Sequence, residues 1–181
     1  FNNNNIHGLG VDSSGNIIVA SAGANAAIEK YDSNGNFISV IATLPSSPFR
    51  MDMDSNDNVY VTSDAGNYVE KIYKITPSGY VSTVYTESND PNLKGIGIDS
   101  SGNMYVGQSF KDYDGVNNWN RCCKIMKYSP SGSLITSMGG WWGNNPPAPA
   151  GLTNESQDIA IHPSTGNVYA ADEINNKISV F

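Results

Sequence analysis

The sequence predicts an all-β protein built from repeated antiparallel strands, and three observations support this fold class. Residues that favour strands are abundant, because Val, Ile, Thr, Tyr, Phe and Trp number 54 of 181. Residues that favour tight turns are abundant as well, with 23 Asn, 22 Ser and 18 Gly. A short turn sequence also recurs four times along the chain, which indicates a repeat architecture.

The repeat consists of an alternating strand, a polar turn and a second strand rich in Val, Ile and Tyr. Its four copies cover residues 8–20, 50–62, 95–107 and 158–171. Each turn ends on a shared asparagine, namely Asn16, Asn58, Asn103 and Asn167. Alternation with a period of two is typical of a strand. Each copy is therefore predicted to form a β-hairpin.

A second hairpin follows in each of the first three copies. Its turns are residues 32–36, 76–80 and 129–133, and its last strands are residues 37–41, 80–85 and 134–138. Four short antiparallel strands in about 42–45 residues make the blade of a β-propeller. A β-sandwich is the alternative, but it gives no reason for the turn sequence to recur.

The fourth copy continues as Ser-Thr-Gly-Asn-Val-Tyr-Ala-Ala-Asp-Glu-Ile-Asn-Asn-Lys-Ile-Ser-Val-Phe, residues 164–181. This segment resembles the NHL repeat, in which Gly-Asn-apolar-Tyr-Val-Ala-Asp precedes Asn-Asn-Arg-Ile and an aromatic residue. The other copies resemble it more loosely, with Ser21 and Ser63 near the place of Asp172. The resemblance implies a propeller, most often of six blades. It implies no single function, because the family includes binding scaffolds, sensor domains, RNA-binding modules and an amidating lyase.

The repeat divides the chain into four predicted blades, at residues 6–44, 48–88, 93–138 and 156–181. The last of these has sequence for only three strands. We therefore expect one propeller domain that is part of a larger, six-bladed type of ring, with a compact four-bladed ring as the alternative. Unpaired strand edges at the two ends are expected to meet protein, by ring closure, by additional sequence not contained in this chain, or by another chain, which includes self-assembly.

The charge of the chain restricts the classes of partner. The formal net charge is −7 and the sequence pI is about 4.6. Only 10 basic residues are spread along the chain, which argues against a nucleic-acid partner. No apolar run approaches the roughly 20 residues of a membrane-spanning helix. The low Lys and Arg content, with many Asn, Ser and Thr, favours a secreted or cell-surface protein outside the cell.

Two long connections are predicted on one face of the propeller, at residues 107–121 and 139–157. They carry the aromatic residues Phe110, Tyr113, Trp119, Trp141 and Trp142. Long loops on a rigid scaffold are a frequent place for function. Exposed aromatic side chains suit a protein or glycan partner. In the alternative, the tryptophans fold back as a plug over the ends of the blades.

The first of these connections also resembles a calcium-binding loop in its composition. Asp112, Asp114 and Asn117 supply alternating oxygen donors around a glycine. The distal glutamate of a helix-loop-helix calcium motif is missing. An Asp- and Asn-rich surface turn is therefore the alternative, and no other cofactor is expected.

The first strands of the blades are expected to line an axial channel. They place His7, Arg50, Asp52, Lys94 and Asp158 around it. A ligand or an active site would lie there, although an Arg50–Asp158 ion pair is also expected. No Gly-x-Ser-x-Gly or His-Glu-x-x-His motif occurs. We therefore predict a non-enzymatic binding or assembly module, with a calcium-assisted hydrolase or lactonase acting at the channel as the rival interpretation.

Overall fold

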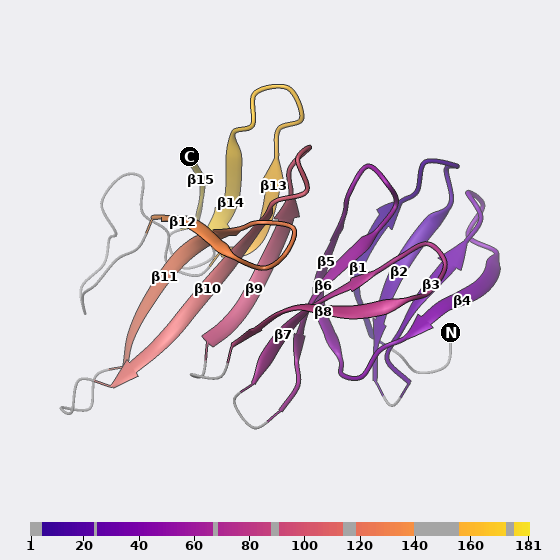
Figure 1. Ribbon diagram of the computed structural model, residues 1–181, viewed down its shortest axis with the longest axis horizontal. Helices are drawn as coiled ribbons and strands as arrows, with labels where there is room; N and C mark the ends of the chain where they lie inside the picture. Colours follow the sequence, from indigo (N-terminus) through magenta and orange to yellow (C-terminus); the bar gives the residue numbers. More distant parts are fainter. Residues whose placement is uncertain are drawn as a thin grey trace.

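The computed structural model describes residues 5–23, 25–66, 69–87, 91–113, 119–139, 156–172 and 176–181. Within these ranges, 15 antiparallel strands form four sheets, and each strand pairs with its neighbours in sequence within its own sheet. Figure 1 shows the sheets following one another in sequence order, from indigo to yellow. This is the predicted arrangement of propeller blades. Within the described ranges, no helix is long and apolar enough to cross a membrane.

The four sheets are named blades 1 to 4. Blade 1 contains β1 (Asn5–Val11), β2 (Ile17–Ala22), β3 (Ala27–Tyr31) and β4 (Phe37–Thr43). Blade 2 contains β5 (Pro48–Met53), β6 (Val59–Asp64), β7 (Glu70–Ile75) and β8 (Val81–Glu87). Blade 3 contains β9 (Pro91–Ile98), β10 (Met104–Tyr113), β11 (Trp119–Tyr128) and β12 (Leu134–Met138). Blade 4 contains β13 (Ser156–Ile161), β14 (Val168–Asp172) and β15 (Lys177–Val180).

The first strand of each blade packs against the first strand of the next, so β1, β5, β9 and β13 line the axis. Glycine permits the close approach at two of these contacts. A Cβ atom on Gly8 would overlap the Met51 side chain, and one on Gly95 would lie 2.5 Å from the Cα atom of Asp158. Side chains on these positions would therefore force the neighbouring blades apart.

The core lies between the blades, in three apolar clusters, one for each pair of neighbouring blades. The same position of the third strand supplies a fully buried isoleucine to each cluster, namely Ile28, Ile72 and Ile125. Burying such a side chain contributes about 1.5–3 kcal/mol. The period-two pattern read from the sequence thus places one face of the inner strands of blades 1 to 3 against the next blade.

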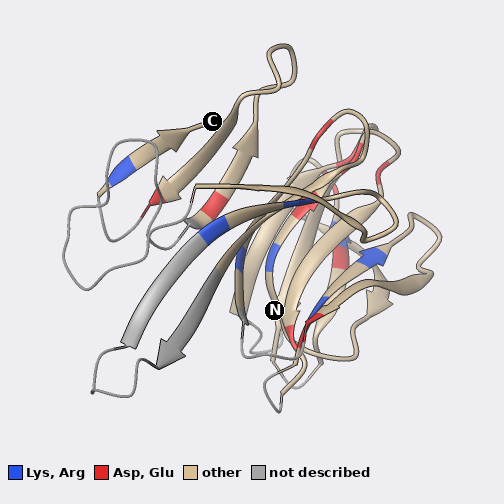
Figure 2. Ribbon diagram, turned by 60° about the vertical axis from the view of Figure 1, so that its left-hand side comes forward, with Lys and Arg blue, Asp and Glu red and all other residues tan. Residues whose placement is uncertain are grey.

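The first turn of blades 1 to 3 is fixed by an aspartate. Asp12 Oδ1 accepts hydrogen bonds from the main-chain N–H groups of Ser14 (3.0 Å) and Asn16 (2.8 Å), and its Oδ2 lies 2.8 Å from Lys30 Nζ. Burial alone would raise the pKa of this carboxyl, but the hydrogen bonds from Lys30 and the turn outweigh it and lower the pKa. Figure 2 shows acidic segments in the turns at one end of the sheets.

One expectation about the connections is wrong. Residues 107–121 were expected to form a long loop, but β10 and β11 each extend over 10 residues and pair without interruption from Gly107–Ile125 to Tyr113–Trp119. After Gly107, the segment contains β-favouring aromatic residues and no glycine or proline before Gly115, so the ladder continues. In Figure 1 this hairpin projects beyond the start of β9. The second expected loop, 139–157, lies outside the described residues except at its ends.

Candidate functional site

Several nitrogen-bearing side chains converge on one aromatic ring at the end of the axis where the first strands begin. The guanidinium carbon of Arg50 lies 5.1 Å from the Phe49 ring centroid, and Lys94 Nζ lies 5.0 Å from the same centroid. The ring of His7 meets Phe49 edge-on, with the centroids 6.1 Å apart. These residues come from β1, β5 and β9. His7, Phe49, Arg50 and Lys94 are called the axial mouth.

Arg50 does not form the ion pair with Asp158 that the sequence suggested. Its Nε donates to the main-chain carbonyl of Gln157 (3.2 Å), and its Nη1 donates to the carbonyl of Phe49 (2.9 Å). Asp158 Oδ1 instead accepts the N–H of Ile159 (3.0 Å). The carbonyls hold the guanidinium in place without neutralising its charge.

Lys94 is the most deeply buried cation of the axial mouth, with 9% of its surface exposed. Within the described ranges, the ion pairs join Lys30 to Asp12, Lys74 to Asp54 and Lys127 to Asp99, so Lys94 has no carboxylate partner there. The Phe49 ring supplies a cation–π contact. Such a contact offsets only part of the cost of burying a charge.

Thr62 positions both cations, although nothing in the sequence marks it as functional. It is completely buried on β6. Its Oγ1 accepts the N–H of Arg50 (3.2 Å) and donates to the carbonyl of Lys94 (3.1 Å), which ties β5 to β9. Its role depends on a contact 32 residues away, which no local pattern reveals.

Two buried polar atoms near the axial mouth have no hydrogen-bond partner in the described part of the chain, His7 Nδ1 and Gln108 Oε1. Gln108 pairs in the sheet with Leu93, the neighbour of Lys94 in sequence. It repeats the buried polar position that the other blades fill with Ser21, Ser63 and Asp172. Buried polar atoms are seldom left unpaired. In the sequence, only the place of Gln108 in the repeat would have identified it as a buried polar residue.

Asp52 lies on the side of blade 2 that packs against blade 3, and both of its carboxylate oxygens accept hydrogen bonds. Oδ1 accepts the N–H of Met53 (2.8 Å) and Oδ2 accepts the N–H of Ile98 (2.7 Å). Burial raises the pKa of Asp52, these two hydrogen bonds oppose the rise, and the charge of Asp158 adds to it. The carboxylate thus links β5 to β9. Among the described residues, no three His, Cys, Asp or Glu side chains group closely enough to hold a metal ion.

The remaining predicted site residues lie on the hairpin of β10 and β11, which we call the outer hairpin, or outside the described residues. Phe110, Tyr113 and Asp112 lie on β10, and Trp119 lies on β11, where only the backbone is described. Trp141, Trp142, Asp114 and Asn117 lie outside the described residues. Phe110 pairs with Pro91 at the start of β9, the strand that carries Lys94. The hairpin therefore extends from the same end of blade 3 as the axial mouth.

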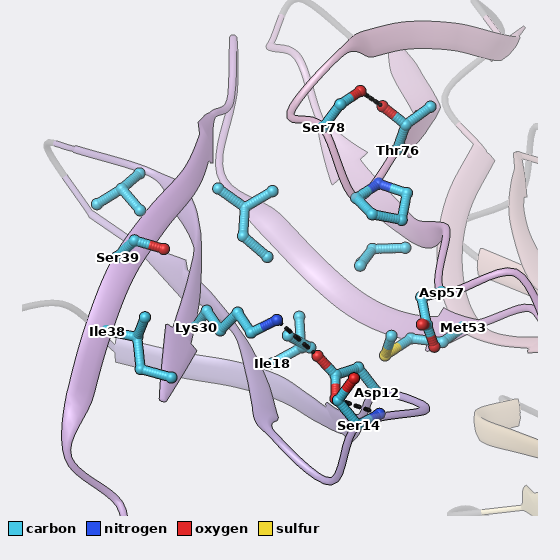
Figure 3. A pocket seen from close by; sticks show the side chains of 14 residues that line it. Asp12, Ser14, Ile18, Lys30, Ile38, Ser39, Met53, Asp57, Thr76 and Ser78 are labelled. Atoms are coloured by element: carbon cyan, nitrogen blue, oxygen red, sulfur yellow. Dashed lines mark hydrogen bonds and ion pairs between the residues drawn. The ribbon is translucent and has the colours of Figure 1, made fainter. Parts of the chain in front are cut away.

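Two clefts lie at the opposite end, among the first turns. One of about 610 Å³ lies between blades 1 and 2, and Figure 3 shows Lys30 pointing to Asp12 within it. The other, of about 410 Å³, is lined by turns of blades 2, 3 and 4 and includes His162. The His162 Nδ1 atom accepts the N–H groups of Ser164 and Thr165, each at 3.2 Å. In the larger cleft, Asp12 pairs with Lys30, and Asp57 accepts hydrogen bonds from the N–H and the hydroxyl of Ser13, so its charged groups already have partners within the protein.

No protein-family profile and no curated protein matches the sequence. Among solved structures, the chain is similar to a protein of unknown function from Bacteroides thetaiotaomicron, with a TM-score of 0.68, 16% identity, and coverage of 97% of this chain and 47% of that one. It is also similar to a gluconolactonase from Xanthomonas campestris (TM-score 0.62, 14% identity, 97% and 58% coverage). A third similar structure is virginiamycin B lyase from Staphylococcus aureus (TM-score 0.52, 16% identity, 97% and 69% coverage).

The chain spans about half the length of the first two of these proteins. At these identities the likeness concerns the fold alone. The β-propeller fold is therefore confirmed, whereas membership of the NHL-repeat family stays a prediction.

Proposed function

We propose that the chain is a ligand-binding propeller module of a secreted or cell-surface protein, and that its axial mouth binds the carboxylate of an acidic glycan. The observation that carries the proposal is Lys94. Its side chain is nine-tenths buried against Phe49 and has no carboxylate partner in the described part of the chain. A buried unpaired charge is unfavourable, and an anionic ligand would neutralise it.

Arg50 favours the same sign of ligand charge. Its guanidinium lies against the ring that also contacts Lys94, and its hydrogen bonds go to neutral carbonyls. Two positive charges in a partly desolvated mouth attract anions, even on a protein with a net charge of −7. The same charges repel a calcium ion, while both oxygens of Asp52 already accept N–H groups.

The outer hairpin supports a glycan as the kind of ligand. Phe110, Tyr113 and Trp119 lie on the two strands that extend from the end of blade 3 that carries the axial mouth. Aromatic residues present flat apolar surfaces to sugar rings or to a protein partner. The aromatic residues would contact sugar rings, and the cations of the axial mouth would bind carboxylates. Together they favour a sugar chain that bears uronic acids over a neutral glycan or a protein.

The experiment compares galacturonate oligomers with the neutral galactose oligomers of equal length by isothermal titration calorimetry. We expect only the acidic oligomer to bind the unchanged protein. The Lys94→Met variant keeps the length of the side chain and removes the charge, so it should weaken binding by roughly 10- to 100-fold, as the loss of one charged hydrogen bond does. Lys71→Met, on the third strand of blade 2, removes the same charge elsewhere and is the matched control.

Three outcomes would contradict the proposal. The neutral and acidic oligomers would bind equally well, or Lys94→Met would bind as tightly as the unchanged protein, or Lys71→Met would weaken binding as much as Lys94→Met. A calcium titration tests the rival interpretation. If Ca²⁺ alone raises the melting temperature and Asp52→Asn removes that effect, the hydrolase interpretation replaces the binding module.

A further inference from the structure

We infer that the larger cleft, between blades 1 and 2, binds a para-substituted phenol ring, which belongs either to a small phenol or to a tyrosine side chain. Its volume is about 610 Å³, and every residue that lines it belongs to blade 1 or blade 2. The cleft lies at the end of the sheets opposite to the axial mouth, so the inference is independent of the proposed function. The repeat shows which group this space accepts, because the later blades fill the equivalent space with a side chain of their own.

Blades 2 and 3 place a buried tyrosine at the position in question. Tyr60 and Tyr105 are 1% and 6% exposed, and each pairs across the sheet with a lysine of the third strand. In blade 1 the corresponding residue is Ile18, which pairs with Lys30 in the same register. Isoleucine lacks both the ring and the hydroxyl group of tyrosine. The cleft therefore lies where blade 1 carries the smaller side chain.

Each of the two tyrosines lies between the lysine and the aspartate of its own blade. Lys74 Nζ lies 5.1 Å from the centroid of the Tyr60 ring, and the Tyr60 hydroxyl donates to Asp54 Oδ2 (3.1 Å). In blade 3 the lysine lies 4.7 Å from the Tyr105 ring centroid, and the hydroxyl lies 3.4 Å from the aspartate. A cation over the ring and a carboxylate at the hydroxyl thus form a frame that holds a phenol.

Blade 1 keeps this frame without the ring. Lys30 Nζ and Asp12 Oδ2 lie 2.8 Å apart, whereas the corresponding atoms are 3.9 Å apart in blade 2 and 3.3 Å apart in blade 3. The lysine and the aspartate therefore lie closest together in the blade where no tyrosine hydroxyl binds the aspartate. Figure 3 shows Ile18 beside this pair. Because the two charges neutralise each other, the cleft favours a neutral ligand over an ionic one.

The apolar wall of the cleft is of the kind that packs on a tyrosine ring elsewhere in the repeat. Met53 and Val59 of blade 2 line the cleft. Their counterparts in blade 3, Ile98 and Met104, belong to the same apolar cluster as Tyr60. An aromatic ring in the cleft would therefore meet apolar side chains on blade 2 and the charged pair on blade 1, which are the surroundings that Tyr60 has.

The test is a titration of the ¹⁵N-labelled chain with p-cresol, the side-chain analogue of tyrosine, followed through backbone amide shifts. A molecule this small is expected to bind with a dissociation constant of about 1 mM. We expect saturable shift changes at Ile18, Lys30 and Ser39, which line the cleft, and none at Lys94 of the axial mouth. 4-Methylcyclohexanol keeps the hydroxyl and the ring size but loses the aromatic face, so it should bind at least about fivefold more weakly. Equal affinity for the two alcohols overturns the inference.

Variants separate the cleft from other binding surfaces. Ile18→Tyr supplies the ring from the chain itself and should abolish the binding of p-cresol. Ile135→Tyr makes the same change at an exposed position (52%) of β12 and should bind like the unchanged chain. If Ile18→Tyr loses its β-sheet circular-dichroism signal, Ser39→Trp takes its place, because Ser39 is exposed and lines the same cleft. Binding that survives in the folded cleft variant, or that is lost in Ile135→Tyr, overturns the inference.

A second titration identifies the source of the ring. N-acetyltyrosinamide presents the phenol in the way that a peptide does. If it binds as tightly as p-cresol, the cleft takes a tyrosine side chain of a protein partner, and if it binds more weakly, the cleft takes a small free phenol. If neither compound gives saturable shift changes in the cleft, the inference is overturned.

Discussion

Ile125 and Ile178 occupy the same repeat position, which allows one substitution to be compared in two environments. Ile125 is completely buried between blades 3 and 4, and Ile178 is 69% exposed. An Ile→Ala change removes three carbons, and at about 0.8 kcal/mol each the lost burial at Ile125 costs about 2.4 kcal/mol. The remaining cavity brings the expected loss in the free energy of unfolding to about 3–4 kcal/mol. At Ile178 about a third of the transfer cost applies, roughly 0.7 kcal/mol.

The assay is urea unfolding of both variants. With a slope of about 2 kcal/mol per molar urea, the midpoint should fall by about 1.5–2 M for Ile125→Ala and by less than about 0.5 M for Ile178→Ala. Equal midpoint shifts for the two variants would refute the reasoning, because they would mean that the two positions are equally packed. A loss below about 1 kcal/mol for Ile125→Ala would refute it as well.

Three further predictions concern turns, charges and aromatic residues. Gly132 and Gly15 both have positive φ angles (84° and 81°), but a Cβ atom on Gly132 would overlap the carbonyl of Val84, whereas one on Gly15 meets open space. Thermal unfolding should therefore show that Gly132→Ala lowers the melting temperature by several degrees more than Gly15→Ala does. Burial alone would raise the pKa of Asp99, but its hydrogen bonds outweigh burial and lower the pKa. The contribution of Asp99 to stability is therefore complete above about pH 4 and is lost as the pH falls through the folded-state pKa. In urea unfolding, Asp99→Asn should lose less stability between pH 7 and pH 3 than the unchanged protein does. Combined replacement of the three tryptophans by alanine should abolish ligand binding in the calorimeter and leave the circular-dichroism spectrum intact, whereas unfolding of this variant would show that they belong to the core. The three residues are Trp119, Trp141 and Trp142.

The propeller could be predicted from the sequence because its determinants are local and repeated. The first turns of blades 1 and 3 each contain an aspartate, a glycine and an asparagine. The hydrogen bonds that Asp12 accepts from the N–H groups of Ser14 and Asn16 span only two and four residues. The isoleucine at the shared position of the third strand likewise recurs with the repeat. Local turn chemistry and alternation therefore located the hairpins before any tertiary contact was known.

The candidate site could be predicted only in part, because its geometry depends on contacts between blades. Their place on the first strands of the blades predicted that Arg50 and Lys94 lie at the axis, but their partners do not follow from the sequence. Arg50 donates a hydrogen bond to the carbonyl of Gln157, 107 residues away in sequence, and does not pair with the carboxylate of Asp158. Thr62 and Gln108 escaped notice because their importance arises from burial beside other blades. The long β10–β11 hairpin was mistaken for a loop because its polar residues outweighed its strand propensity.

The most direct test of the binding proposal is a map of backbone amide chemical shifts during titration with a galacturonate oligomer. The account predicts that the largest ¹H–¹⁵N shift changes occur at the axial mouth, at Arg50 and Lys94, and that they saturate with one apparent dissociation constant. Amides in the turns at the opposite end, such as Gly15, should stay unchanged, and the neutral galactose oligomer should move none of them. Changes confined to the turn end, or the same changes with the neutral oligomer, would contradict the account.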